Sequence, residues 1–155
     1  MHSLAGGCHC GNIRAQLQLP REPPAYAPRA CDCDFCRKHG AAYVSDPQAA
    51  LTLRVLDEQL AGTYRQGSGQ AEMLFCRQCG VLVGALLRAA GQLYGVVNTR
   101  VFDGGTRFGT EQPVSPQTLS ADQKVRRWQE IWCSNVTIIS GKAAAAGGAS
   151  GSQHE

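Results

Sequence analysis

The stretch CDCDFCRKHG (residues 31–40) places three thiols within six residues and follows them with Arg37, Lys38 and His39. Such crowding of reactive side chains has three common uses: disulfides, a metal site or a redox nucleophile. The remaining cysteines decide among them, because the full set forms one CxC, one CxCxxC, one CxxC and one single residue. Outside the opening stretch these are Cys8, Cys10, Cys76, Cys79 and Cys133.

This cysteine pattern favours a metal. Thiols one or two residues apart converge readily on one point but bridge to each other only under strain. Zinc is held tetrahedrally by Cys or His, at a Zn–S distance of about 2.3 Å, and short paired motifs are typical of its sites. The start of the chain, MHSLAGGCHCG (residues 1–11), also lacks the basic and apolar regions of a secretory leader. We therefore predict zinc, with disulfides and a purely redox cluster as the alternatives.

The composition is that of one folded domain. The chain has 155 residues, of which 43% are hydrophobic and 17% are charged. Aromatic residues make up only 6%, with 18 Gly and 7 Pro, so we expect metal cross-links to add rigidity that the core does not supply. We predict a single zinc-binding domain over residues 1–139. An Ala-, Gly- and Ser-rich tail over residues 140–155 is expected to be disordered.

Charge and hydropathy exclude two classes of partner. The formal charge of +3 counts cysteines as neutral, and seven thiolates on two divalent ions would bring the protein close to zero. The basic residues are scattered and no aromatic-rich strand accompanies them, so no nucleic-acid partner is expected. The longest apolar run, VLVGALL (residues 81–87), is too short to span a bilayer. We expect a soluble, cytoplasmic protein without a membrane partner.

Period-two alternation predicts a mainly β fold of short antiparallel strands with one or two short helices. The clearest strand is IRAQLQL (residues 13–19). Four prolines within residues 20–28 predict an exposed loop that leads to Cys31. Further strands are predicted at residues 41–44, 51–56, 60–65, 71–75, 81–88 and 92–98.

One helix is predicted in SADQKVRRWQEIW (residues 120–132). Ser120 can cap it, and Asp122 suits its first turn. Trp128 and Trp132 stand four residues apart on this helix, so they share a face. Packing of that face on the sheet is the preferred interpretation, and ligand stacking is the alternative.

Strand geometry divides the cysteines into two sites. Cys76 and Cys79 flank a turn between two predicted strands, where Gly80 supplies the positive φ of a zinc knuckle. Cys8 and Cys10 are the natural partners, because alternation along a strand points both thiols the same way. These four residues would form a closed, structural zinc site with no position for a substrate.

The remaining grouped thiols are Cys31, Cys33 and Cys36. Three protein ligands with a fourth position open are typical of catalytic zinc, so we predict a second, catalytic zinc ion here. The alternative is that His39 or Cys133 completes a second structural site. Cys133 is otherwise expected to be a small buried apolar residue.

Charged residues flank the second site. Asp32 and Asp34 either orient groups around the cation or are plain turn residues. Arg37 and Lys38 would offset the negative charge of a three-thiolate zinc site, and plain surface charge is the alternative.

The motifs GGCHCGNIR, CDCDFCRKHG, YRQGSGQAEMLFCRQCG and KVRRW occur in the order and spacing of a known family. Over residues 6 to 132 the chain resembles the glutathione-dependent formaldehyde-activating enzymes, which include centromere-protein-V-like proteins. The resemblance implies a β-tent fold and two zinc ions, held by the two cysteine sets described above. The chain differs from the family in two places. It has Asp32-Cys33-Asp34 where members commonly have His-Cys-Ser, and it has no histidine in PVSPQTLS (residues 113–120), where one is common.

The resemblance implies a carbon–sulfur lyase that adds a small thiol such as glutathione reversibly to an aldehyde such as formaldehyde, as an S-(hydroxymethyl)glutathione synthase does. A thiol that enters the open position of the second site should then lose its proton and become the nucleophile. Arg37 and Lys38 are predicted to bind this anionic substrate, with Arg100 and Arg107 as further candidates. Two other functions stay open. In one, both zinc ions are a scaffold for a protein-interaction module. In the other, the three-thiol site senses oxidants or metals.

Overall fold

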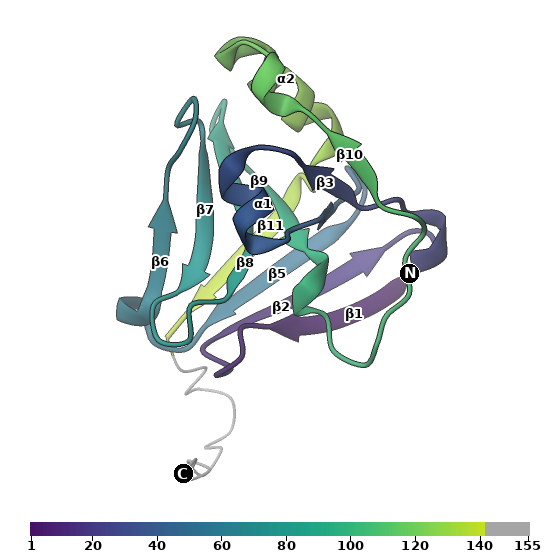
Figure 1. The fold of residues 1–155 in the computed structure, drawn as a ribbon. Coiled ribbons are helices and arrows are strands. Elements are labelled where there is room, and N and C mark those ends of the chain that lie inside the picture. The colour runs from purple at the N-terminus through teal and green to yellow at the C-terminus, as the bar shows by residue number, and fades with distance from the viewer. Residues whose placement is uncertain (142–155) are drawn as a thin grey trace, which may run out of the picture.

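The computed structural model describes residues 1–141, which form two β-sheets and two α-helices (Figure 1). The first sheet has four strands in the order β1-β2-β5-β11. Their bounds are His2–Gly7 for β1, Ile13–Leu19 for β2, Ala50–Val55 for β5 and Asn135–Ser140 for β11.

The second sheet has seven strands in the order β10-β3-β4-β9-β8-β7-β6. Its long central strands are joined by tight turns, whereas β3, β4 and β10 are two or three residues long. The bounds are Arg29–Cys31 for β3, Tyr43–Val44 for β4, Ala61–Tyr64 for β6, Ala71–Cys76 for β7, Leu82–Ala89 for β8, Gln92–Asn98 for β9 and Gln112–Val114 for β10.

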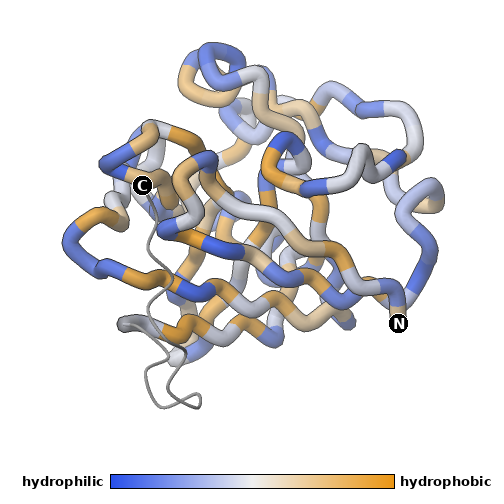
Figure 2. The backbone as a smooth tube through the Cα atoms, turned by 90° about the horizontal axis from the view of Figure 1, so that it is seen from below, coloured by the Kyte–Doolittle hydropathy of each residue, from blue (hydrophilic) through white to orange (hydrophobic). Residues whose placement is uncertain are grey.

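Most strand pairs are antiparallel, as the alternation predicts. Along β2 every second side chain is buried, and the tube coloured by hydropathy shows the same change between polar and apolar residues along the strands (Figure 2). Two pairs are parallel instead, β3 with β10 and β5 with β11. In both cases the partners are far apart in the sequence, which leaves room for the crossover that a parallel pair needs.

The two α-helices begin at side-chain caps. Helix α2 (Ala121–Ile131) starts with a capping box, because Ser120 accepts from the Gln123 N–H while the Gln123 side chain accepts from the Ser120 N–H. Helix α1 (Asp34–His39) has Cys33 as its N-cap and ends at Gly40 in the left-handed conformation, at a φ of 58°. Short 3₁₀ turns occur at Pro23–Ala25, Glu58–Leu60, Thr99–Val101 and Pro116–Thr118.

The seven-stranded sheet is buried on both faces. Adjacent residues on its central strands belong to different apolar clusters: Leu74 packs toward the four-stranded sheet, and Met73 packs with Trp132 on the other side. Helix α2 packs on this second cluster through Val125 and Trp128. The sheet therefore separates a core between the sheets from a smaller core beneath the helices, and the candidate site lies over the smaller one.

The predicted strands are confirmed within one or two residues, and β2 has the bounds that its pattern predicts. The capped helix at residues 120–132 is also confirmed. The loop at residues 20–28 is largely exposed, as predicted, but Tyr26 and Pro28 are buried and the Tyr26 hydroxyl donates to Asp46 at 2.8 Å. The predicted tail falls almost wholly on residues 142–155, outside the described residues.

Five elements were not predicted: the strands β1, β3, β10 and β11, and the helix α1. Strand β1 (HSLAGG) has no clear alternation, and most of β11 is exposed as an edge strand. Helix α1 has only six residues, too few for a periodic pattern. Among the described residues, no helix has the length and apolar character that crossing a membrane requires.

Candidate functional site

The first four-cysteine set lies where two hairpin turns meet. Cys8 and Cys10 occupy the turn between β1 and β2, Cys76 ends β7, and Cys79 lies in the turn before β8. The expected alternation of Cys8 and Cys10 along a strand is therefore wrong: the backbone reverses there, with the Gly11 N–H donating to the Cys8 carbonyl at 3.2 Å. On the other side Gly80 has the expected positive φ, 80°.

The sulfur atoms of this set have the spacing of a tetrahedral zinc site. All four lie within 4.8 Å of one another. Cys8 Sγ is 3.8 Å from Cys10 Sγ, which is 3.5 Å from Cys76 Sγ. A tetrahedron with Zn–S bonds of about 2.3 Å has edges of about 3.8 Å, whereas a disulfide needs about 2.05 Å. The cysteines are free, and their arrangement fits a zinc ion.

The four thiols of this set differ in how readily they ionise. Burial raises the pKa of Cys8 to about 12. Burial also acts on Cys79, but the backbone N–H groups of Cys10 and Val81 outweigh it and lower the pKa of Cys79 to about 6. Four neighbouring thiols therefore cannot all ionise by themselves, and a divalent cation is what would allow it.

The second set is assembled by the short helix α1. Cys31 ends β3, Cys33 caps the helix, and Cys36 lies buried in its first turns. The Cys33 sulfur accepts from the Cys36 N–H at 3.4 Å, so the cap holds this sulfur over the first turn of the helix. The three sulfur atoms lie within 4.8 Å of one another and could hold a metal ion.

The thiols of the second set also differ in how readily they ionise. The hydrogen bond from Cys36 lowers the pKa of Cys31 to about 6, whereas the same contact and burial raise the pKa of Cys36. The Tyr43 hydroxyl lies 3.1 Å from the Cys36 sulfur. Burial, and then its cysteine neighbours, raise the pKa of Tyr43, so this hydroxyl keeps its proton and can donate to a thiolate.

Neither candidate for a fourth ligand joins the second set. Within residues 1–141 the cluster contains three cysteines and no other Cys, His, Asp or Glu. The His39 ring instead packs on Phe35, with ring centroids 4.7 Å apart. Cys133 is fully buried in the core between the sheets, as its predicted apolar role requires.

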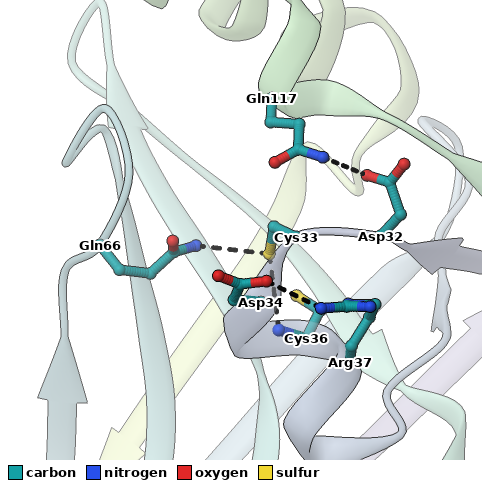
Figure 3. Close-up of polar contacts among 7 residues, drawn as sticks. All are labelled: Asp32, Cys33, Asp34, Cys36, Arg37, Gln66 and Gln117. Carbon is teal, nitrogen blue, oxygen red and sulfur yellow. Dashed lines mark hydrogen bonds and ion pairs between the residues drawn. The ribbon is translucent and has the colours of Figure 1, made fainter.

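A cavity of about 510 Å³ opens beside the three cysteines. All three line it, together with residues of α2, the turn between β6 and β7, and the segment after β10. The Gln66 amide reaches the Cys33 sulfur from the β6–β7 turn, at 3.9 Å (Figure 3). The four-cysteine set contributes nothing to this lining.

Asp32 fixes the rim of the cavity. Its carboxylate accepts from the Gln117 amide at 3.2 Å (Figure 3). The same carboxylate also accepts from the Ser115 hydroxyl. Its backbone N–H donates to the Val114 carbonyl at 3.0 Å. Asp34 instead pairs with Arg37 at 2.9 Å. Asp32 is therefore bonded to β10 and to the segment that follows it.

The cations that line the cavity are not those singled out in the sequence. Arg37 and Lys38 are exposed on the last turn of α1 and do not line it. The lining cations are Arg29, Lys124 and Arg127. The sequence did indicate that Lys124 and Arg127 share a helix face with Trp128 and Ile131. These four residues follow the helical spacing i, i+3, i+4 and i+7.

Taken together, the fold and the site define a mainly β protein with two cysteine clusters suited to zinc. One is closed by four thiols, and the other has three thiols beside a cavity. Residues 3–135 match the family described as glutathione-dependent formaldehyde-activating enzyme, and the chain belongs to this family. The resemblance seen in the cysteine motifs is thereby confirmed.

A solved structure is also similar to this chain. It is the crystal structure of a Rhodobacter sphaeroides protein from a structural genomics programme, with 28% sequence identity and a TM-score of 0.47. The similarity covers 64% of this chain and 88% of that one. The family assignment rests on the match over residues 3–135.

Proposed function

We propose that this protein is a zinc-dependent carbon–sulfur lyase that joins a small, glutathione-like thiol to an aldehyde and cleaves the resulting adduct. The observation that carries the proposal is the second cysteine cluster. It has three thiols, no further ligand among the described residues, and a cavity of about 510 Å³ beside it. Catalytic zinc sites commonly have three protein ligands and a fourth position for water or substrate.

Cys31, Cys33 and Cys36 would hold the catalytic zinc ion, and the four-cysteine cluster would hold a structural one. The catalytic ion would supply Lewis acidity, which lowers the pKa of a thiol below its usual value of about 8.5. The chain's own groups keep the ligand sulfurs in place: the Cys36 N–H and the Gln66 amide donate to Cys33, and the Tyr43 hydroxyl lies against Cys36.

Addition and cleavage use the same groups in opposite directions. In the addition reaction, the thiol sulfur gives an electron pair to the carbonyl carbon, and the thiol proton ends on the carbonyl oxygen. No oxidant or reductant is needed. The apolar part of the cavity wall would limit the access of water to the reacting atoms. Binding of the substrate's carboxylates by Arg37 and Lys38, which lie just after Cys36, stays a prediction.

We expect protein purified without added metal to contain two zinc ions per chain. The reason is that two separate cysteine clusters each bring their sulfurs within 4.8 Å. Elemental analysis against a quantified protein concentration measures this ratio. A value near one, or a metal-free protein that stays folded, would contradict the two-zinc assignment.

We also expect the zinc-loaded protein to accelerate the exchange of glutathione between its free form and its formaldehyde adduct. Magnetisation-transfer NMR measures this exchange at equilibrium, without a coupled assay. The matched control is heat-denatured protein with the same zinc content, which separates catalysis by the site from catalysis by released metal. If a panel of small thiols and aldehydes shows no acceleration over this control, the lyase proposal fails and the scaffold function should replace it.

A further inference from the structure

The cavity beside the three cysteines contains cationic side chains without a carboxylate partner. Among the described residues, no acidic group pairs with Arg29, Lys124 or Arg127. The one acidic residue in the lining, Asp34, is already engaged by Arg37 at 2.9 Å. The positive charge of the lining is therefore available to a ligand.

Arg29 is held in place by neutral groups. It lies half-buried on β3, and its guanidinium donates to the Ser45 hydroxyl at 2.6 Å. Ser45 in turn donates to the Ile131 carbonyl at the end of α2, at 2.7 Å. This chain of hydrogen bonds fixes the direction of the guanidinium and leaves its charge uncompensated, and a fixed guanidinium is well suited to bind a carboxylate.

Arg127 adds a second guanidinium to the wall of the same cavity. It lies on an exposed position of α2, and no acidic group pairs with it among the described residues. Like charges on one cavity wall repel each other, and an anion placed between them would be attracted by both. The two guanidinium groups are therefore suited to bind a carboxylate.

Apart from these cationic side chains, the wall of the cavity is mostly apolar. Trp128 and Ile131 lie on the face of α2 that lines the cavity, and Met73 and Val96 come from the sheet beneath. Trp128 stacks on Trp132, with ring centroids 5.0 Å apart and an interplanar angle of 23°. Formaldehyde contributes a single carbon atom and glutathione is largely polar, so neither accounts for this apolar surface.

We propose that the cavity selects thiol–aldehyde adducts that carry both a carboxylate and an apolar group of about the size of a phenyl ring. The carboxylate would lie between Arg29 and Arg127, and the apolar group would lie against Trp128 and Ile131. This inference rests on the proposed lyase function and specifies its substrate class. The reaction is unchanged: a C–S bond forms, and the thiol proton moves to the carbonyl oxygen.

Intrinsic fluorescence gives a direct measure of binding. The chain has only two tryptophans, and both line the cavity. The zinc-loaded full chain is titrated with S-benzylglutathione and with S-methylglutathione, which differ only in the apolar group. We expect the benzyl compound to bind at least about tenfold more tightly, since burying a phenyl ring is favourable. Equal affinities would overturn the apolar half of the inference.

The anionic half is tested with Arg127→Gln, a change at an exposed helix position that should leave the fold intact. We expect S-benzylglutathione to bind at least about tenfold more weakly, and Arg29→Gln to have the same effect. Arg126→Gln is the matched control, because Arg126 is exposed on the same helix and does not line the cavity. Equal weakening by Arg126→Gln and Arg127→Gln would overturn the assignment of the anion site.

The carboxylate could belong to the thiol half or to the aldehyde half of the adduct. Two thioethers separate these sources: the benzyl thioether of 3-mercaptopropionate and the 4-carboxybenzyl thioether of 2-mercaptoethanol. The tighter ligand identifies the half that carries the carboxylate. The uncharged benzyl thioether of 2-mercaptoethanol should bind more weakly than both, and binding as tight as theirs would overturn the inference.

These ligands also separate the two proposals. A thioether has no thiol proton and cannot undergo the addition, so its binding does not depend on lyase activity. Selective binding of the benzyl carboxylates without NMR exchange activity would contradict the lyase proposal alone. Exchange activity without selective binding would contradict the substrate class alone.

Discussion

Replacing Cys76 by serine is expected to prevent the domain from folding. Cys76 is fully buried, and its sulfur lies 3.5 Å from that of Cys10 in the four-cysteine cluster. A closed structural zinc site commonly contributes about 10 kcal/mol or more to folding. A domain of this size is stable by only about 5–15 kcal/mol in total, so losing the site removes most of that margin.

The measurement is circular dichroism and urea unfolding of the purified variant, together with its zinc content. Cys133→Ala is the matched control, because Cys133 is equally buried but lies in neither cluster. It should cost only about 1 kcal/mol, from lost packing. If Cys76→Ser unfolds at the same urea concentration as Cys133→Ala, the four-cysteine cluster is not a structural metal site.

Replacing Cys33 by serine is expected to abolish activity and leave the fold intact. Serine is a good N-cap residue, so its hydroxyl can accept from the Cys36 N–H as the Cys33 sulfur does. The substitution therefore keeps helix α1 and removes one thiolate of the second cluster. We expect one zinc ion per chain, and a loss of more than about a hundredfold in the exchange rate, since a catalytic metal contributes several kcal/mol.

Elemental analysis and the NMR exchange experiment test this variant together. Arg126→Gln is the control for activity, because this exposed residue belongs to neither cysteine cluster nor the cavity lining. A Cys33→Ser protein that retains two zinc ions and full exchange activity would show that the second cluster is not the catalytic one. One zinc ion with unchanged activity would place the reaction outside this cluster.

The side chain of Asp32 affects the rim of the cavity. Asp32 bonds to Ser115 and Gln117, and these two residues line the cavity while the Asp32 side chain holds them. Although Asp32 lies between Cys31 and Cys33, its carboxylate does not join the second cysteine cluster. Its role is to hold the rim of the cavity in place. The sequence left two interpretations of Asp32 open: a plain turn residue, or a residue that orients groups around the cation. Neither describes this contact between distant segments.

Much of the fold and most of the cysteine arrangement could be predicted from the sequence. The spacing within CxC, CxCxxC and CxxC limits each motif to one point in space, because a few residues of backbone cannot carry thiols far apart. Alternation along β2 and the capping residue Ser120 likewise act within a few residues. These features depend on local geometry, which the order of residues largely determines.

The composition of the cavity was decided by tertiary structure alone. Arg29 and Arg127 lie almost a hundred residues apart, and they line the same cavity only because β3 joins the seven-stranded sheet and α2 packs over it. Arg37 and Lys38 were the obvious cations because they follow Cys36 directly, yet α1 turns them to solvent. Nearness in sequence does not fix the side of an element on which a residue lies, and the packing of distant elements does.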